Sequence, residues 1–403
     1  MPRSAAADAH APTPARIRGA RAAAMVAFAT NGALPASLLA RYAEVKEALG
    51  LSPALFGLLV VGYAVGGTLA MHLPGVVSRR IGVARAAALG TVWVAAAFVV
   101  VAVGVTLGSP WIVLAGLMAA GCGDAVVDVA QNAQGIRVQE AGGRSVLNSM
   151  HAGWSVGAAL GGGVGTLAAV LGVPLLAHLG VWSLICAASM ALAARRFLPE
   201  TTLALDAEAP TARPPGLRVA MLLAPLALVA LAGISVEDVG NNWSAVLLAS
   251  ERDAPVAAAG VGLSVLLGAQ FVGRLLGDRV VDRIGARPAL LGSLSAVVVG
   301  MLGTAWAPSL ALTLAALAVA GLGCAITVPL AFAGADALEG LPAHSGVTWI
   351  SWTMRTVSIG LSPAIGGLTT VWSLPTALTL VTVIAVAALM LQLRPRRPSA
   401  AQH

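Results

Sequence analysis

The sequence predicts an all-α membrane protein of about twelve transmembrane helices arranged as two six-helix bundles. Apolar residues make up 58% of the 403 residues, charged residues only 10%, and the mean hydropathy is +0.88. In a soluble domain about a quarter of the residues are charged, far more than here, so water is a poor solvent for this chain. The apolar residues also fall into runs of about twenty, the length that spans a hydrocarbon core of about 30 Å. We therefore expect the lipid bilayer to surround most of the chain.

Turn residues divide the apolar runs into individual spans. The first six are expected at about 20–41, 53–73, 86–107, 110–134, 146–171 and 174–194. The second six are expected at about 217–236, 256–276, 288–306, 309–332, 345–368 and 374–393. Breaks such as Gly108-Ser109-Pro110 and Pro214-Pro215-Gly216 separate them. The expected domains are a tail (1–19), a first bundle (20–197), a polar linker (198–216), a second bundle (217–393) and a tail (394–403).

Basic residues lie mainly in the connecting segments on one side of the membrane, which are every second segment between the expected spans. That side holds the N-terminal arginines and Arg79, Arg80, Arg85, Arg137, Arg144, Arg195, Arg196, Arg213, Arg218, Arg274, Arg279, Arg283, Arg287, Arg394, Arg396 and Arg397. The opposite side holds only Arg41, Lys46 and Arg252, and Arg355 is the single basic residue expected within a span. Positive loops remain in the cytoplasm, so we expect both termini there, in a bacterial inner membrane. This dispersal argues against nucleic-acid binding.

The two halves contain a weak internal repeat. Gly75-Val76-Val77-Ser78-Arg79-Arg80-Ile81-Gly82 follows the second expected span, and Gly277-Asp278-Arg279-Val280-Val281-Asp282-Arg283-Ile284-Gly285 follows the eighth. Both segments end in Arg-Ile-Gly at the same position within their half. The match indicates a duplicated six-helix unit.

The later segment resembles the signature loop of the major facilitator superfamily. In that loop an Asp-Arg pair and glycines link the second and third helices of a half, as Asp282-Arg283 and Gly285 do here; Gly277, Asp278 and Arg279 add a second acidic-basic pair. The first half carries Gly75, Arg80 and Gly82 but departs from the pattern at Arg79, where an aspartate is expected. The resemblance implies the major facilitator fold, conformational switching through these loops, and a monomer.

Three further stretches resemble the subgroup of the proton-coupled fucose permease. They are Asp128 to Asn132, Asn148 to Gly157, and Glu237 to Ser244. This resemblance implies symport of a sugar or similar small polar solute with protons.

Asp124, Asp128 and Asn132 are spaced four apart and therefore share one face of a helix. A charge in the bilayer costs several kcal/mol, so this face must point to the protein interior or to a water-filled cavity. We expect Asp128 to be the proton-coupling carboxylate and Asp124 to be a second candidate. A structural hydrogen bond to a neighbouring helix and direct binding of substrate by Asp128 remain alternatives, and Asn132 is a candidate substrate ligand.

Arg355, His151 and Trp154 are further substrate-binding candidates. Arg355 needs an acidic partner, for which Asp128, Asp124 and Glu237 qualify, or it binds an anionic or hydroxyl-rich substrate. His151 can titrate near neutral pH or satisfy a structural hydrogen bond. Trp154 suits stacking on a sugar ring, with packing or interfacial anchoring as the alternative.

A polar run follows the seventh expected span. It contains Glu237, Asp238, Asn241, Asn242 and Trp243. We expect a broken helix that lines water, with Glu237, Asn241 and Trp243 contacting substrate or a gate. The competing interpretation is a solvated helix end.

The sequence lacks the motifs that mark several kinds of catalytic or cofactor-binding site. There is no phosphate-binding loop, no metal-spaced His/Cys cluster and no Ser/His/Asp arrangement, so we expect neither an enzyme nor a metal or organic cofactor. The expected function is secondary transport driven by a proton gradient, with a small-molecule substrate, protons and the lipid bilayer as partners. Proton-driven efflux of drug-like or cationic compounds is the first alternative, and a transport-inactive receptor or scaffold is the second.

Overall fold

The computed structural model describes residues 12–143, 146–199, 217–338 and 345–393, and these residues form helices and connections without a β-strand. The N-terminal half contains eight helices: α1 (Pro14–Leu39), α2 (Tyr42–Ala48), α3 (Pro53–Leu69), α4 (Leu73–Ile81), α5 (Val83–Thr106), α6 (Pro110–Gly142), α7 (Leu147–Val170) and α8 (Leu175–Ala194).

The C-terminal half repeats this plan. It contains α9 (Leu217–Asp238), the π-helix η2 (Val239–Trp243), α10 (Ser244–Glu251), the 3-10 helix η3 (Val256–Ala258), α11 (Val261–Ile284), α12 (Ala286–Trp306), α13 (Leu310–Cys324), α14 (Thr327–Asp336), α15 (Ser345–Leu368) and α16 (Leu374–Leu393).

Ten helical units of the described chain are long and apolar enough to cross a membrane. The pair α3 and α4, bent by 58° at its break, is an eleventh span. α15, 24 residues long with bounds that equal the expected 345–368, has the length of a twelfth span, although it contains Arg355 and is less apolar than these eleven. The all-helical structure with its two repeated halves confirms the predicted fold class. Several helices run beyond their apolar stretches: α1 begins at Pro14, α6 continues to Gly142 and α11 to Ile284.

Capping residues in the sequence mark where several of these helices begin. Ser52 and Ser109 each precede a proline, and their side chains accept a hydrogen bond from the backbone N–H three residues later. Proline is favoured at the first helical position because that position needs no N–H donor, and a serine cap adds about 1 kcal/mol of helix stability.

Small residues allow close packing within the first bundle. Gly153, Gly157, Gly161 and Gly165 recur every four residues along α7, and all four face the backbone or side chains of α1. Without a hydrophobic driving force between helices in lipid, such stripes let backbones approach and gain dispersion contacts. The outward faces instead carry large apolar side chains, including Leu184 (71% exposed) and Val299 (64% exposed).

The internal repeat has a matching backbone. Gly82, between α4 and α5, has φ 86° and ψ 151°, and Gly285, between α11 and α12, has φ 88° and ψ 156°. This region is accessible essentially only to glycine. The shared Arg-Ile-Gly therefore encodes the same turn in each half.

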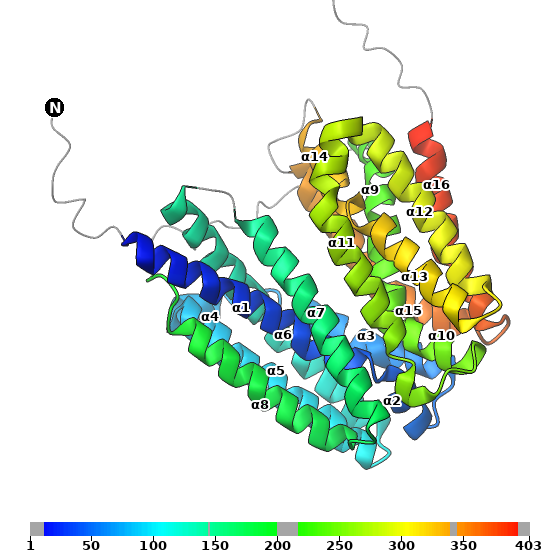
Figure 1. The fold of residues 1–403 in the computed structure, drawn as a ribbon, viewed down its shortest axis with the longest axis horizontal. Helices are drawn as coiled ribbons and strands as arrows, with labels where there is room; N and C mark the ends of the chain where they lie inside the picture. Colours follow the sequence, from blue (N-terminus) through cyan, green and yellow to red (C-terminus); the bar gives the residue numbers. More distant parts are fainter. Residues whose placement is uncertain (1–11, 144–145, 200–216, 339–344, 394–403) are drawn as a thin grey trace, which may run out of the picture.

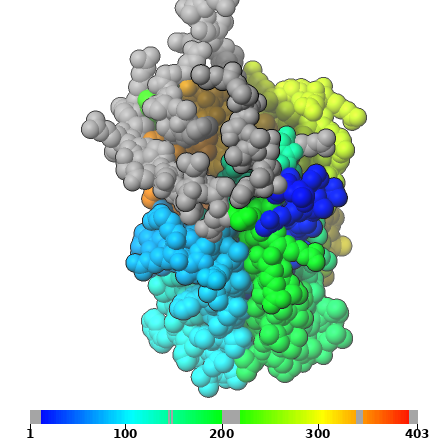
Figure 2. Space-filling model, turned by 90° about the vertical axis from the view of Figure 1, so that its left-hand side faces the viewer, coloured from blue at the N-terminus to red at the C-terminus, as the bar shows by residue number. Residues whose placement is uncertain are grey.

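The two halves lie side by side and diverge toward the end at which the chain enters α1 and leaves α16 (Figure 1). We call that end the termini side and the opposite end the far side. Figure 2 faces the N-terminal half, where α5 lies against α8. Close approaches between the halves occur toward the far side. A Cβ placed on Gly57 of α3 would lie 2.5 Å from the carbonyl oxygen of Ser362 in α15, and Gly260, just before α11, lies against the carbonyl of Ala40.

Candidate functional site

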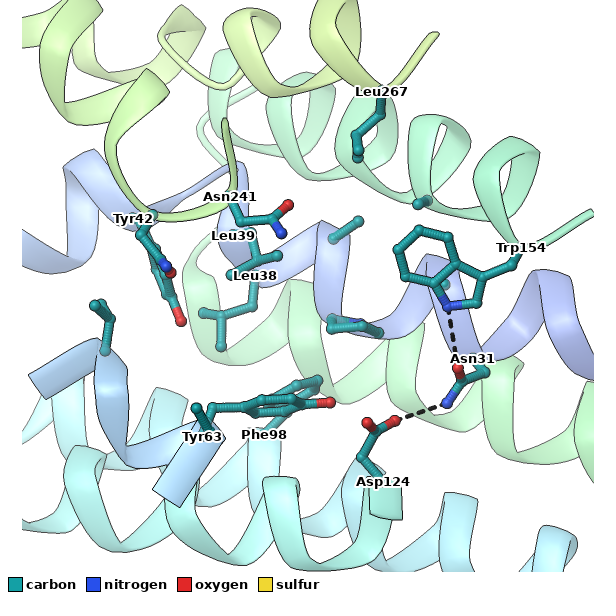
Figure 3. A pocket seen from close by; sticks show the side chains of 17 residues that line it. Asn31, Leu38, Leu39, Tyr42, Tyr63, Phe98, Asp124, Trp154, Asn241 and Leu267 are labelled. Carbon is teal, nitrogen blue, oxygen red and sulfur yellow. Dashed lines mark hydrogen bonds between the residues drawn. The ribbon is translucent and has the colours of Figure 1, made fainter. Parts of the chain in front are cut away.

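A cavity of about 220 Å³ lies between the two halves. Seventeen residues line it, mostly from α1, α3, α6 and α7 on one side and from the π-helix and α11 on the other (Figure 3). Ligand pockets for drug-sized molecules occupy about 300–1,000 Å³. The dimensions therefore suit a small solute.

Asn31 of α1 organises the polar end of the cavity. Its Nδ2 donates a hydrogen bond to Asp124 Oδ1 at 2.7 Å, and its Oδ1 accepts from Trp154 Nε1 at 3.1 Å and from Gln131 Nε2 at 3.2 Å (Figure 3). Three helices, α1, α6 and α7, thus meet at one amide. The network holds the carboxylate and the indole in fixed positions beside the cavity.

Asp124 is the single charged residue among those that line the cavity. The hydroxyl of Tyr63 faces its carboxylate, and no ion pair to Asp124 is present in the described parts of the chain (Figure 3). A carboxylate removed from water without a cationic partner is costly in free energy. The arrangement thus leaves Asp124 available for a proton or for a cationic group of a ligand.

Aromatic rings form much of the remaining wall. Tyr63 stacks on Phe98 with ring centroids 6.3 Å apart, and Tyr42 lies at the opposite end of the cavity from Asp124 (Figure 3). The chain has only two tyrosines, and both line this cavity.

The far end of the cavity is closed by an aromatic and polar cluster. Trp243 is completely buried, lies edge-on to Phe56 of the other half at 5.7 Å, and donates from Nε1 to Ser362 Oγ at 3.1 Å. Ser362 in turn donates to Asp238 Oδ2 at 2.8 Å, and Asn242 donates to Asp238 Oδ1 at 2.9 Å. We call Asp238, Asn242, Trp243 and Ser362 the far-side cluster.

The polar run in the seventh span forms a π-helix rather than a solvated helix end. The helix continues through Val239–Trp243 into α10 and ends only at Glu251. The wider turn brings the consecutive Asn241 and Asn242 to the cavity. π-bulges occur frequently at functional sites. The expected interruption of the α-helix is therefore present as a change of helix type, without an opening of the chain.

Glu237 and Trp243 lie away from the cavity lining. Glu237 accepts a hydrogen bond from Gln270 and forms an ion pair with Arg274 Nη2 at 3.1 Å. Arg274 Nη1 also donates to Ser155 Oγ of α7 at 2.7 Å, across the two halves. The expectation of a single basic residue within the spans is therefore wrong, because Arg274 lies inside α11 and not in a loop. The pairing also removes Glu237 as the acidic partner of Arg355.

Asp128, His151 and Arg355 lie on the termini side of the cavity. All three are exposed, although each belongs to a membrane-length helix, and the charges of His151 and Arg355 act on Asp128. Asn132 donates to Asp128 Oδ1 at 3.1 Å, and His151 packs against Phe28. Exposed charged groups of both halves therefore lie on this side, and Asp128 follows Asp124 by one helical turn along α6.

The residues of the two repeated loops lie at the termini side. Arg79, Arg80, Asp278, Arg279, Asp282, Arg283 and Gly285 are exposed, and Gly277 is buried against Ile326. Gly75 lies beside the Arg79 guanidinium. The two ion pairs found in the described residues, Arg41–Glu44 and Arg274–Glu237, involve none of the loop residues.

Sequence reasoning missed several site residues. Asn31, Tyr42, Tyr63 and Ser362 lie at the cavity or its far-side cluster, but none of them belongs to a polar motif of the sequence. The scarcity of tyrosine and the isolated amide at Asn31 were available signals. Groups of three His, Cys, Asp or Glu side chains that could hold a metal ion are absent from the described residues.

Fold and site together define a polytopic membrane protein with an internal solute cavity between two repeated bundles. The model of the Major Facilitator Superfamily matches residues 20–333, so the chain belongs to this family and is a membrane transporter rather than an enzyme. Two bacterial relatives are each 28% identical: an uncharacterized MFS-type transporter of Yersinia pestis, over 76% of this chain and 77% of the relative, and the uncharacterized transporter y4wD of Sinorhizobium fredii, over 80% and 84%.

Solved structures share the fold at low sequence identity. A point mutant of the nucleoside transporter NupG matches with a TM-score of 0.75 at 12% identity, covering 93% of this chain and all of that one. A D-xylose-proton symporter matches with a TM-score of 0.67 at 15% identity over 94% and 97%. A point mutant of the fucose:proton symporter FucP of E. coli matches with a TM-score of 0.56 at 14% identity over 94% and 98%.

Proposed function

We propose that this protein is a proton-coupled secondary transporter that moves a small polar solute, such as a sugar, by alternating access. The observation that carries the proposal is the cavity between the two halves: it is small and polar at both ends, the far-side cluster lies beyond one end, and exposed charged residues of both halves lie on the termini side. The solved structures of similar fold include proton symporters of fucose and xylose, which adds support.

Both termini lie in the cytoplasm of a bacterial inner membrane in this proposal. The described arginines on the termini side outnumber those on the far side, as the charge bias of cytoplasmic loops requires. With this orientation the conformation described above is inward-facing. The transporter acts as a monomer, since each copy holds a complete cavity, and it needs no bound cofactor beyond the proton gradient.

Asp128 is the proposed proton-coupling group. It is exposed on the termini side, where water can deliver a proton, and the charges of His151 and Arg355 act on it. A proton on Asp128 changes its attraction for Arg355 in the other half, so its loading and release can be linked to closing and opening of this side. Asp124, one turn away on the same helix and in the cavity lining, is the second candidate.

Measurement of solute-triggered current in proteoliposomes with an imposed pH gradient tests this proposal. The wild type, Asp128→Asn and the control Glu140→Gln would be compared on a panel of sugars and cationic compounds; Glu140 is an exposed carboxylate near the end of the same helix. We expect current in the wild type and control and none in Asp128→Asn. An undiminished current in Asp128→Asn contradicts the assignment of proton coupling to Asp128.

Proton-driven efflux of drug-like or cationic compounds is the second candidate function. It is favoured by the acidic character of the cavity, where Asp124 is the charged lining residue. Efflux predicts that cells lacking the protein retain more of the compound, and that an uncoupler raises retention in cells that have it. Symport predicts inward accumulation that the uncoupler abolishes.

A further inference from the structure

The cavity lining has one acidic side chain, Asp124, and none of its seventeen residues is basic. Toward the termini side Arg274 is engaged by Glu237 and Ser155, and Arg41 on the far side is engaged by Glu44. An anionic solute would therefore meet a carboxylate without a compensating cation, whereas a cationic solute would meet its counter-ion.

Several hydrogen-bond acceptors are left free in the cavity. Asn31 uses one amide N–H on Asp124, and its oxygen already accepts from Trp154 and Gln131. Asn242 donates both N–H groups, to Asp238 and Ser362, which leaves its carbonyl oxygen for the cavity. Lone pairs of Asp124 remain as well. A solute with several donors in one group satisfies such a site best, and an ammonium carries three.

Aromatic side chains lie near the carboxylate. Trp154 and Tyr63 lie near Asp124, and Phe98 stacks on Tyr63 (Figure 3). The faces of such rings attract cations, with the largest effect where water is excluded. Ring walls beside a single carboxylate are therefore suited to an organic ammonium group.

The opposite end of the cavity is polar and uncharged. Asn241 lines it without a hydrogen bond to another residue of the described chain, so its amide offers both a donor and an acceptor. The Tyr42 hydroxyl lies nearby. Groups of this kind pair with hydroxyls, which donate and accept equally. The cavity thus distinguishes a charged end from a hydroxyl end.

We propose that the solute is a small hydroxylated amine whose ammonium group binds Asp124 and whose hydroxyls reach Asn241. This inference rests on the proposed function and assigns Asp124 to the solute, leaving Asp128 to the proton. Asn31 is then a positioning residue, because it holds the carboxylate through its amide.

Counterflow exchange in proteoliposomes without a pH gradient tests the inference, since exchange does not depend on proton coupling. The probes are matched pairs that differ in one group: D-glucosamine against D-glucose, and 2-amino-1,3-propanediol against glycerol. Variants Asp124→Asn and Asp124→Glu would be compared with Glu140→Gln as the control. Monodispersity on size exclusion checks that each variant is folded.

We expect the wild type to exchange the amine of each pair at least about tenfold more efficiently than its neutral partner, the order of effect for a hydrogen-bonded charge. Asp124→Asn should remove this preference, Asp124→Glu should retain part of it, and the control should be unchanged. If Asp124→Asn does not fold, the ratio in the wild type and in Asp124→Glu still decides the matter.

Equal exchange of both members, preference for the neutral member, or exchange of neither overturns the inference. The proposed function fails differently. Amine-selective exchange with no response to an imposed pH gradient removes proton coupling and keeps the solute class. Neutral-solute transport driven by the gradient keeps the proposed function and removes the amine.

Discussion

Each half of the molecule contains a carboxylate, an asparagine and a tryptophan in one polar cluster, yet the clusters have different surroundings. Asp124, Asn31 and Trp154 of the N-terminal half face the cavity and are only partly buried. In the far-side cluster of the C-terminal half, Trp243 is completely buried under Phe56 of the other half.

The difference shows how the same types of side chain can either bind a solute or close one end of the cavity. In the far-side cluster Ser362 joins Asp238, Asn242 and Trp243, so the side-chain N–H and O–H donors all have acceptors within the cluster. In the N-terminal cluster the Asp124 carboxylate keeps unpaired capacity. A satisfied polar network rigidifies its surroundings, whereas an unsatisfied one favours a ligand.

Replacement of Gly57 by leucine should have the largest effect on this contrast. The added side chain would start 2.5 Å from the backbone oxygen of Ser362 and 3.3 Å from the Trp243 ring. Overpacking of this kind costs about 3 kcal/mol or more, so the far side cannot close and solute flux should fall at least about a hundredfold. Gly180→Leu is the control, because nothing lies within 4 Å of a Cβ at Gly180. Normal flux in Gly57→Leu would contradict the assigned closure.

Replacement of Asn31 by alanine should weaken solute binding through Asp124. The variant loses the 2.7 Å hydrogen bond to the carboxylate and the anchor of Trp154. Hydrogen bonds to charged groups contribute about 1.5–3 kcal/mol, so the half-saturating solute concentration should rise about ten- to a hundredfold. Gln131→Ala, which loses one bond to Asn31 at 3.2 Å and one to Asp128 at 3.3 Å but none to Asp124, should give a smaller rise. An unchanged half-saturation in Asn31→Ala would remove the cluster from the binding site.

Replacement of Gly82 or Gly285 by alanine tests whether the halves are equivalent in their loops. Gly82 has φ 86° and Gly285 has φ 88°, a backbone region that costs other residues about 1–3 kcal/mol. The two variants should lower thermal stability by similar amounts, measured by the unfolding temperature in detergent. A loss of stability in only one variant would show that the two turns have the same backbone conformation but contribute differently to stability.

The smallest change is Trp243→Phe, which keeps most of the ring packing on Phe56 but removes the N–H that donates to Ser362 at 3.1 Å. One hydrogen bond contributes about 0.5–1.5 kcal/mol, so the far side should open more readily by about two- to tenfold. The measurement introduces Tyr42→Cys into both proteins and compares the rates at which the thiol reacts with a reagent added from that side. The same rate with and without Trp243→Phe would assign the seal to ring packing alone.

The fold was predictable because lipid imposes simple rules on sequence. Spans such as 345–368 and 374–393 coincide with α15 and α16. The limits of α6 and α11 were underestimated because helices extend past the apolar core, where polar residues such as Glu140 and Asp282 keep the helical pattern. For the same reason Arg274, near the end of an expected span, was placed in a loop.

The site was only partly predictable. Helical spacing placed Asp124, Asp128 and Asn132 on one face because that spacing is local. Whether Glu237 lines the cavity or pairs with Arg274 depends on the contact between α9 and α11, which no local pattern encodes. The same holds for Trp243, whose burial depends on Phe56 from the other half.

Distances across the two ends of the molecule test the central claim, alternating access between the halves, most directly. One spin-label pair at Glu47 and Val371 would span the far side, and a second at Arg80 and Arg283 would span the termini side; all four residues are exposed. Without solute, the account predicts a short far-side distance and a long termini-side distance. Addition of a transported solute should lengthen the first and shorten the second. Two distances that stay fixed, or that change in the same direction, would contradict alternating access around this cavity.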